Sequence, residues 1–550
     1  MISVLLLAQA SVETRSRGWV WVVGIGLVLA AVLAAVIFRA VIKSLPDDVG
    51  APVRAAARSN ATPMGVGAVI VIATIVFALY SAGMPVVESN GTGTDVAAGR
   101  TSSGEEVTED GAVEGATVTP DGGTTGGTTA SGGRSTATTR RGGTAAAGTS
   151  LGATVAPGFT VKDSNLFSGA SNTRGITDTT VKVCGHAALS LGAVLNTKPE
   201  DLLVFWKYLN EKGGLYGRKF EVSLEDDQYT AEGGVPAAQA CAEKNPFMIF
   251  GALGSDVIPP VRLWAEQNKE LYLYGFTLRK GSENLRYSFS GGISQEDLSL
   301  VIADLAVKKF SGKKLGLIWR NSTNLQPGRD VFKKYVESKG MKIVADIPVQ
   351  KSQGSYTQEI ITLQQAGAEA VFVLEDAVTQ LNVIKQGKTQ QYNPNWLVFT
   401  FNIQTQTLGA DALNPPLRGA NLAPAYECRT YDGPYASYAA EIREFEAAYA
   451  KYSPNTDLCG IAGDIAWGGW MGFKGMAALF EACGPNCTRN RYAGVMESGY
   501  KATIGAACEV DFSRTGHHGV WAADVMEAYA GPRGRPAFRN TQRCAKAPAG

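Results

Sequence analysis

Residues 370–399 read AVFVLEDAVTQLNVIKQGKTQQYNPNWLVF, an apolar run followed by an acidic turn, an amphipathic stretch of helical period and a second apolar run. The same unit repeats from residue 180 to residue 401. Its apolar, β-rich runs lie at 181–185, 220–224, 246–250, 271–274, 314–319, 342–345, 370–374 and 396–399. Strand and helix periods that alternate at this spacing specify parallel βαβ units. The sequence therefore predicts an α/β protein with two such sheets in series, and a cleft between them suits a clamp that closes on a small molecule.

Composition sets broad limits on what the chain does. Its 550 residues are enough for about three domains of average size. Lys and Arg number 51 and Asp and Glu number 50, so the formal net charge is +1. This balance gives no electrostatic reason to expect nucleic acid as a partner.

The cysteines all lie in the C-terminal two thirds of the chain. They are Cys184, Cys241, Cys428, Cys459, Cys483, Cys487, Cys508 and Cys544. An even number without a Cys-x-x-Cys pair favours disulfides in an oxidising compartment over a zinc site. Buried free thiols are the alternative interpretation. We expect at least two disulfides, and the sequence does not decide which cysteines pair.

Two uncharged runs, at residues 19–38 and 65–84, precede the repeated units. Each is long enough to cross a bilayer as a helix, so residues 1–86 are expected to form a multi-pass membrane hairpin that acts as a signal anchor. Basic residues around the loop between the runs outnumber those before the first run: Arg39, Lys43, Arg54 and Arg58 against Arg15 and Arg17. The positive-inside rule then places the loop in the cytoplasm and the C-terminal domain outside the cell membrane.

The segment 87–158 is rich in Gly, Thr, Ser and Ala and contains no aromatic residue. Such a composition buries too little apolar surface to fold and predicts a disordered linker. About 70 residues of it span roughly 50 Å as a random coil. We therefore expect residues 87–158 to tether a folded domain, residues 159–550, to the membrane.

Four motifs follow one another in the first group of units. They are Gly-Gly-Leu-Tyr-Gly-Arg-Lys at 213–219, Glu-Asp-Asp at 225–227, Phe-Gly-Ala-Leu-Gly-Ser at 250–255 and Tyr-Gly-Phe-Thr at 274–277. Their order and spacing resemble the type I periplasmic (solute) binding proteins, specifically the leucine/isoleucine/valine-binding family of ABC importers. The resemblance covers about residues 175–530.

The resemblance implies two Rossmann-like lobes joined by three crossovers. The first would contain about residues 175–290 and 426–516, and the second about 291–425 and 517–550. In open sheets of this kind the ligand cleft lies at the carboxyl ends of the strands. Strand ends in both lobes therefore supply the candidate ligand-binding residues.

In the first lobe the candidates are Ser255, Phe276 and Thr277. Ser255 lies just before a predicted helix, where a hydroxyl and free backbone N–H groups can hold a carboxylate. Thr277 falls at the position that matches the family's ligand-binding threonine. The resemblance implies that this hydroxyl pair takes the α-carboxylate of an amino acid. From the residues alone an ordinary helix cap is the favoured interpretation of Ser255, and the resemblance makes the two roles about equal.

In the second lobe Glu375 and Asp376 end a predicted strand and could receive an ammonium group, although such a pair also fits a solvated first turn of a helix. Asn402 lies about where amino-acid-binding relatives have an acid, and Gln326 about where they present a tyrosine. These departures weaken the expectation of an aliphatic amino acid. They leave open amides, carboxylates, aromatic acids and peptide-like ligands.

Signals of catalysis are lacking in the sequence. The only histidines are His186, His517 and His518, and no phosphate-binding loop, Gly-x-Ser-x-Gly elbow or Gly-x-Gly-x-x-Gly after a strand is present. His186 is expected to be a hydrogen-bonded structural residue. We therefore expect no catalytic residue, no metal and no cofactor. An enzyme of the amidase or dehydrogenase class is the least favoured of three interpretations, after the two described next.

The favoured interpretation is a membrane-tethered, extracytoplasmic solute-binding protein. It would deliver a small polar ligand (an amino acid, an amide or a small carboxylate) to the permease subunits of an ABC importer by hinge closure. The alternative is an extracellular ligand-sensing receptor domain of the same fold without a transport role.

Overall fold

The computed structural model describes residues 150–192, 196–351 and 353–548. These residues belong to the second of two compact units, Arg134–Gly550. The predicted membrane runs at 19–38 and 65–84, and most of the predicted linker, lie outside the described residues. Within the described residues, no helix combines the length and apolar character needed to cross a bilayer. The hairpin and the linker therefore stay predictions.

The first sheet of the described unit is mostly parallel and contains the strands of the first group of units. Its strand order is β1 (Thr154–Val155), β12 (Lys501–Thr503), β13 (Val510–Asp511), β14 (His518–Val520), β6 (Ser288–Ile293), β5 (Tyr272–Phe276), β4 (Met248–Leu253), β2 (Thr180–Ala187) and β3 (Lys219–Asp226). Strand β2 pairs in parallel with both β3 and β4, and β4 pairs with β5. The last strands, β12 to β14, extend the sheet on the far side of β6.

The second sheet has a parallel centre and an antiparallel edge. Its strand order is β16 (Pro536–Lys546), β15 (Ala522–Ala530), β11 (Arg418–Asn421), β10 (Asn395–Phe399), β9 (Ala370–Leu374), β7 (Lys314–Arg320) and β8 (Lys342–Val349). Strand β9 is buried at every residue, as expected for a parallel strand covered by helices on both faces. The antiparallel ribbon of β15 and β16 falls outside the βαβ repeat of the sequence.

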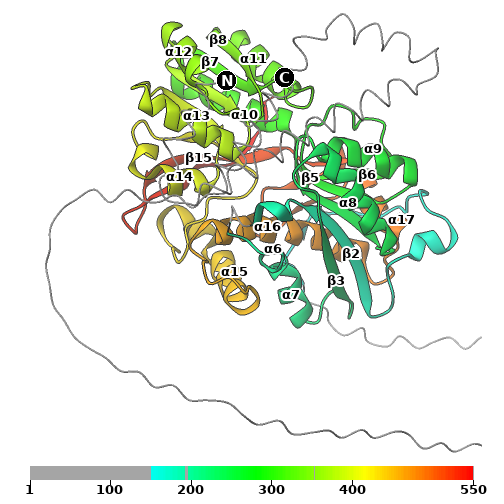
Figure 1. Ribbon diagram of the computed structural model, residues 1–550. Helices are drawn as coiled ribbons and strands as arrows, with labels where there is room; N and C mark the ends of the chain where they lie inside the picture. Colours follow the sequence, from blue (N-terminus) through cyan, green and yellow to red (C-terminus); the bar gives the residue numbers. More distant parts are fainter. Residues whose placement is uncertain (1–149, 193–195, 352, 549–550) are drawn as a thin grey trace, which may run out of the picture. The chain divides into compact units, whose positions relative to one another are not determined.

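Helices cover both sheets. Those of the first lobe are α6 (Pro199–Leu202), α7 (Val204–Glu211), α8 (Ala231–Glu243), α9 (Ile258–Asn268), α15 (Ala439–Tyr452), α16 (Ile461–Cys483) and α17 (Arg489–Glu497). Those of the second lobe are α10 (Gln295–Phe310), α11 (Gln326–Ser338), α12 (Thr357–Gln365), α13 (Ala377–Thr389) and α14 (Asn402–Leu408). Figure 1 shows the two sheets with their helices as separate halves of the unit, with β2, β3 and β5 in one and β7 and β8 in the other. We call the halves the first and the second lobe. The predicted two-sheet α/β fold is confirmed.

Three crossings connect the lobes within the described residues. The first runs from β6 to α10, whose first turn is capped by Ser294 accepting a hydrogen bond from the Asp297 N–H at 3.1 Å. The second follows β11, after which α15 packs on α7. The third lies at Trp521, between β14 and β15. Such a multiple connection allows the lobes to rotate about a hinge while the strand ends stay opposed.

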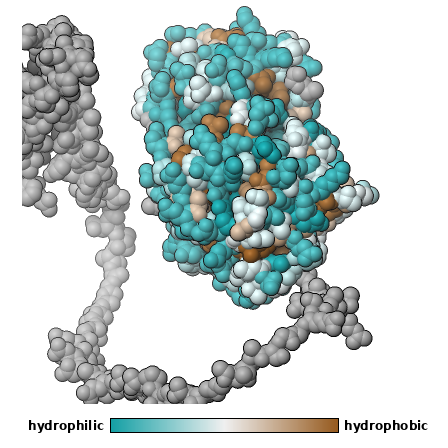
Figure 2. Space-filling view, turned by 90° about the vertical axis from the view of Figure 1, so that its right-hand side faces the viewer, coloured by the Kyte–Doolittle hydropathy of each residue, from teal (hydrophilic) through white to brown (hydrophobic). Residues whose placement is uncertain are grey.

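Aromatic side chains fill the core of the first lobe. Trp206 packs on Phe220 and on Phe473, with ring centroids 4.7 and 5.6 Å apart, and Phe220 also contacts Phe480. Aromatic pairs contribute about 0.5–1.5 kcal/mol each beyond the area they bury. On the surface, Figure 2 shows a face covered mainly by hydrophilic residues, with hydrophobic ones in small, scattered groups.

The eight cysteines form four disulfides, which confirms the prediction of at least two. The pairs are Cys184–Cys241, Cys428–Cys459, Cys483–Cys487 and Cys508–Cys544. The first joins β2 to α8, and the second joins the segment after β11 to the loop before α16. A set of disulfides of this kind is typical of a protein from an oxidising compartment.

Candidate functional site

The carboxyl ends of β4 and β5 place Ser255 and Thr277 at neighbouring positions of the first lobe. The two strands are paired in register, and the Gly254 N–H donates to the Phe276 carbonyl at 3.0 Å. Gly275 allows this close pairing, because a Cβ atom there would lie 2.0 Å from the Ala252 carbonyl oxygen. The structure thus puts both predicted hydroxyls at one edge of the sheet. Their role in binding stays a prediction.

The hydroxyls of Ser255 and Thr277 have different surroundings. Val257, and not Ser255, occupies the cap position of α9, so the cap interpretation of Ser255 does not apply. Thr277 is 2% exposed, and its Oγ1 has no hydrogen-bond partner among the described residues. A buried polar atom without a partner costs about 1–3 kcal/mol. An unpartnered hydroxyl at a strand end is what a site for a polar ligand would provide.

Asp256, the residue after Ser255, makes a polar contact between the lobes. One of its carboxylate oxygens, Oδ2, lies 2.5 Å from Nη1 of Arg320 and 3.7 Å from Nζ of Lys351. The other, Oδ1, accepts a hydrogen bond from Nδ2 of Asn324 at 3.2 Å. Arg320 ends β7, and Lys351 follows β8. A carboxylate of the first lobe therefore accepts hydrogen bonds from two side chains of the second lobe and forms an ion pair with a third.

Arg320 also binds the acidic pair that the sequence suggested for an ammonium group. Its Nε lies 3.0 Å from both Glu375 oxygens, and its Nη2 lies 2.7 Å from Glu375 Oε2 and 3.4 Å from Asp376 Oδ2. Burial raises the pKa of the Glu375 carboxyl, against the lowering effect of Arg320. Although burial lowers the pKa of Arg320, hydrogen bonds and charge from Glu375, together with the charges of Asp256 and Asp376, raise it above its usual value overall. Glu375 is thus committed to a buried arginine.

Asp376 additionally caps a helix. Its Oδ1 accepts a hydrogen bond from the Thr379 N–H at 3.0 Å, at the start of α13. A place in the first turn of a helix is the structural alternative to ligand binding that the sequence suggested for Asp376. The capping bond and the contact with Arg320 leave the ligand role of Asp376 a prediction.

Tyr229 and Lys351 border the same charged group. The Lys351 ammonium donates to the Tyr229 carbonyl at 3.2 Å and lies 5.3 Å from the centre of its ring. Burial, and after it the charge of Asp376, raise the pKa of the Tyr229 hydroxyl. We call the group formed by Tyr229, Asp256, Arg320, Asn324, Lys351, Glu375 and Asp376 the cleft cluster. Of its members, sequence reasoning singled out only Glu375 and Asp376.

Phe276 and Gln326 differ in their position relative to the interface between the lobes. Phe276 makes an edge-to-face contact with Phe399, at the end of β10, with ring centroids 5.6 Å apart. This contact is apolar and joins the two lobes. Gln326 is exposed in the first turn of α11. The structure therefore brings Phe276 to the interface between the lobes and leaves Gln326 at the surface of its helix.

Asn402 belongs to a second polar group, which is separate in its contacts from the cleft cluster. Its amide donates to the Tyr426 carbonyl at 2.8 Å and to the Asp464 carboxylate. Burial raises the pKa of the Asp464 carboxyl well above its usual value, against the lowering effect of the Asn402 hydrogen bond. Both amide hydrogens of Asn402 are thereby engaged by groups of the protein.

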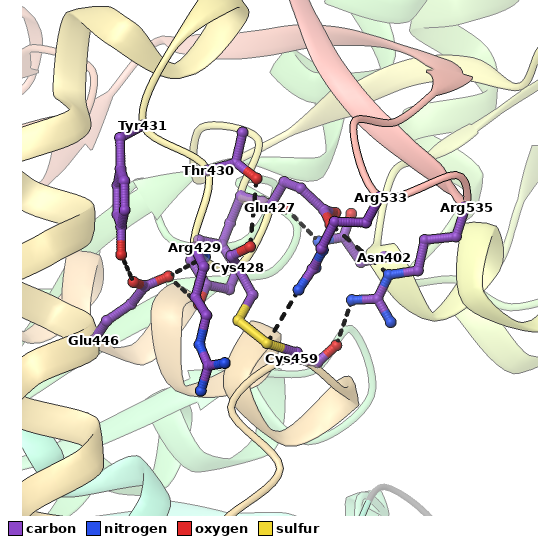
Figure 3. Close-up of a disulfide and its surroundings, with 11 residues drawn as sticks. Asn402, Glu427, Cys428, Arg429, Thr430, Tyr431, Glu446, Cys459, Arg533 and Arg535 are labelled. Atoms are coloured by element: carbon purple, nitrogen blue, oxygen red, sulfur yellow. Dashed lines mark hydrogen bonds and ion pairs between the residues drawn. A yellow bond between two sulfur atoms is a disulfide. The ribbon is translucent and has the colours of Figure 1, made fainter.

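The surroundings of Asn402 include a disulfide and two arginines (Figure 3). Arg533, in the turn between β15 and β16, donates to Glu427 at 2.9 Å and to Sγ of Cys459 at 3.2 Å. Arg535 donates to the Cys459 carbonyl at 2.8 Å, and its Nε lies 3.8 Å from Glu427. We call the group formed by Asn402, Glu427, Asp464, Arg533, Arg535 and the Cys428–Cys459 disulfide the crossover cluster, because Glu427 follows the crossing after β11.

His186 has the structural role that the sequence suggested. Its Nδ1 lies 2.7 Å from Asp227 Oδ2, its Nε2 lies 2.8 Å from the Tyr272 hydroxyl, and its side chain is fully buried. Among the described residues, one group has the spacing of metal ligands, Cys508, Asp524 and Cys544. Its two sulfurs form a disulfide, so it does not present thiolate ligands.

Comparison with known proteins agrees with this geometry. A sequence model of the family described as "Periplasmic binding protein" matches residues 204–532, which is more than half of the chain. No curated protein matches the chain significantly.

Several solved structures share the fold. One is a solute-binding protein of an ABC transporter from Rhodopseudomonas palustris BisB5 in complex with 3,4-dihydroxybenzoic acid, with 18% identity, a TM-score of 0.52 and coverage of 68% of this chain and 99% of that one. Another is a fatty acid ABC transporter substrate-binding protein from Thermomonospora curvata, with 16% identity, a TM-score of 0.55 and coverage of 70% and 95%. A third is a branched-chain amino acid ABC transporter protein from Thermus thermophilus with bound valine, with 15% identity, a TM-score of 0.54 and coverage of 68% and 98%.

At such identities the solved structures show a common fold, and the family match shows membership. The family consists of substrate-binding proteins and not of enzymes, in agreement with the expectation from the sequence. With its two opposed α/β lobes, three crossings and polar strand ends, the chain belongs to the periplasmic-binding-protein family, of the type I class that the motifs predicted.

Proposed function

We propose that this protein is a membrane-tethered, extracytoplasmic solute-binding protein that delivers a small polar ligand to an ABC importer by hinge closure. The observation that carries the proposal is the meeting of polar strand ends from both lobes, where Asp256 of one lobe contacts Arg320 of the other. In open α/β sheets, ligands bind at the carboxyl ends of the strands. A ligand between these ends would contact both lobes and favour their closed arrangement.

The ligand we propose is an amino acid, an amide or a small carboxylate, with the carboxylates favoured. The similar solved structures name dihydroxybenzoic acid, a fatty acid and valine, and each of these compounds carries a carboxylate. Ser255 and Thr277 of the first lobe remain proposed ligand contacts, together with Phe276, Gln326, Glu375, Asp376 and Asn402. The unpartnered Thr277 hydroxyl is the strongest of these candidates.

A ligand screen on the full-length protein in detergent tests the binding function. A ligand that binds only the folded protein stabilises it by about 2.7 kcal/mol at a hundredfold excess over its Kd. We expect at least one carboxylate or amino acid to raise the melting temperature, and calorimetry should then give a saturable isotherm. If amino acids, amides and small carboxylates all leave the melting temperature unchanged, the proposed ligand class is wrong.

Transport is tested in proteoliposomes. The liganded protein should stimulate ATP hydrolysis by the permease encoded with it or purified with it, whereas a sensing domain of the same fold would not. The comparison uses protein with and without the ligand from the screen. Equal ATP hydrolysis in both samples would count against delivery to an importer.

The membrane arrangement rests on the uncharged runs at 19–38 and 65–84 and on the disulfides. Because all eight cysteines are paired, a single introduced cysteine would be the free thiol of the protein. We expect an impermeant thiol reagent on intact cells to label Ser131→Cys and to spare Ser44→Cys. The opposite pattern would reverse the proposed topology.

A further inference from the structure

The cleft cluster contains a complete set of donors for one carboxylate. Arg320 and Lys351 provide positive charge, and Asn324 provides a neutral N–H donor. These groups come from the ends of two neighbouring strands, β7 and β8, and all lie on the second lobe. Together they contact both oxygens of Asp256, which comes from the first lobe.

We propose that Arg320, Asn324 and Lys351 form a carboxylate-binding site on the second lobe, for which Asp256 and the carboxylate of a ligand compete. The inference rests on the proposed function, since it names the ligand group that this cleft takes. It also reverses the polarity expected from the sequence, which assigned a carboxylate to the hydroxyls of the first lobe and an ammonium group to the acids of the second.

The orientation of the Arg320 side chain is fixed by Glu375 and does not depend on a ligand carboxylate. Glu375 is 2% exposed and holds the guanidinium through both Nε and Nη2. This leaves Nη1 directed at Asp256. An arginine whose fork is fixed in this way loses little side-chain freedom when it binds a carboxylate.

Asp256 is the member of the cluster that can leave. It lies in the turn between β4 and α9, and its side chain is 20% exposed, against 7% for Arg320. Its main-chain position belongs to the first lobe, so a separation of the lobes would withdraw it from the three donors. A ligand carboxylate would then take the same donors at the same strand ends, and the lobes would close on the ligand with Asp256 displaced from these donors.

The charges of the cluster favour a ligand with a single carboxylate. Arg320 and Lys351 balance Glu375 and Asp376, so the second-lobe groups are formally neutral, and Asp256 brings the total to −1. One ligand carboxylate in its place reproduces that total. A neutral amide would lack the charge-assisted hydrogen bonds, which are about twice as strong as neutral ones.

Acetate is the probe that tests the site, because it is little more than the side-chain carboxylate of Asp256. In the full-length protein, Asp256→Ala removes the competitor and should open the site to acetate. We expect acetate to raise the melting temperature of this variant more than that of the wild type, and its apparent Kd to be at least tenfold lower. Acetamide, and chloride at equal ionic strength, serve as controls and should have little effect.

The second-lobe donors are tested in the same background. Adding Lys351→Met to Asp256→Ala should weaken acetate binding about tenfold, the loss expected for one charged contact. Asp256→Ser, which keeps a polar residue that turns accommodate well, is used if the alanine variant does not fold. Equal responses of the variant and the wild type to acetate, or equal responses of the variant to acetate and acetamide, would overturn the proposal.

The acetate test of the carboxylate site and the ligand screen that tests the proposed function can fail independently of each other. Acetate binding by the Asp256 variant does not require the transported compound, so a negative screen of the wild type with a positive acetate response of the variant would contradict the proposed ligand class and support the carboxylate site. A positive screen with no acetate response in either Asp256 variant would overturn the carboxylate site alone.

Discussion

The cleft cluster and the crossover cluster both join the lobes through a carboxylate and an arginine, yet they differ in what else holds them. In the cleft cluster the link between Asp256 and Arg320 is noncovalent and lies at the strand ends of the two sheets. In the crossover cluster, Glu427 and Arg533 lie beside the Cys428–Cys459 disulfide and next to a chain crossing. Similar ion pairs therefore occur in two different settings at the interface between the lobes.

The difference between the clusters has a physical origin. Ion pairs formed at an interface exchange for water or for a ligand at moderate cost, because the charges regain solvation when they separate. The crossover cluster cannot separate far, since it lies next to a chain crossing whose backbone limits it, while the Cys428–Cys459 disulfide ties together two segments of the first lobe. We infer that closure of the cleft pivots near the crossover cluster, and the following predictions test each side of this comparison.

The largest effect is expected in the cleft cluster on replacing Arg320. Arg320→Met leaves Glu375 buried without its partner, and breaking a buried pair from one side costs about 3–5 kcal/mol. Urea denaturation of the ligand-free protein should show this loss.

The matched control is the double variant Arg320→Met with Glu375→Gln, which removes both charges. It should recover most of the lost stability, because the uncompensated charge is gone. If the single and double variants unfold at the same urea concentration, Glu375 does not depend on Arg320 for its buried charge.

The next effect concerns the disulfide of the crossover cluster. Cys428 and Cys459 are 31 residues apart, so replacing both with alanine should lower the free energy of unfolding by about 3.5 kcal/mol through the entropy of the unfolded chain. Removing Cys483–Cys487, with a separation of 4, should cost only about 2 kcal/mol on the same basis. Urea unfolding without reductant compares the two variants, and a larger loss for the short loop would contradict the expected role of the longer one.

The sequence predicts the individual strands and helices, because these depend on the local periodicity of apolar residues. The run at 370–374 becomes β9, and its five residues are all buried, because a parallel strand covered on both faces needs a continuous apolar run. The order of strands is not local. Arg320 contacts Glu375 because β7 lies beside β9, and no pattern within either segment states this.

The candidate site could be predicted only in outline for the same reason. The sequence located the strand ends, where Ser255 and Thr277 do lie side by side. Asp256 and Arg320 are 64 residues apart and belong to different lobes, so their contact depends on how the lobes face each other. A search for charges directly after predicted strands would have found Arg320, which follows the run at 314–319, but not Asp256, which lies six residues beyond the run at 246–250.

A smaller effect is expected at the first-lobe side of the cleft, on ligand binding. Thr277→Val keeps the shape of the side chain and removes a hydroxyl that has no partner within the described residues, so the ligand-free protein should lose little stability. If the hydroxyl binds the ligand, affinity should fall by about 1.5 kcal/mol, or roughly tenfold, in calorimetry. Ser255→Ala should act in the same direction.

The control for these two variants is Ser288→Ala. Ser288 is a buried serine of β6 whose hydroxyl donates to the Arg262 carbonyl at 3.3 Å. Its removal should lower stability and leave ligand affinity unchanged. If Thr277→Val and Ser255→Ala behave like this control, the two hydroxyls are structural.

The last effect is a pH dependence expected at Asp464 in the crossover cluster, where the acid is bonded to a neutral amide instead of an arginine fork. Burial raises the pKa of this carboxyl in the folded protein, so the folded state binds the proton more tightly than the unfolded state. The associated stability is full below the unfolded pKa of about 4 and is lost as the pH rises through the folded pKa. Asp464→Asn stays neutral and can still accept the Asn402 hydrogen bond. It should therefore be more stable than the wild type at pH 7 and equal to it near pH 4. Urea denaturation across this range measures the difference, and a constant gap between the two proteins would show that Asp464 keeps an ordinary pKa in the fold.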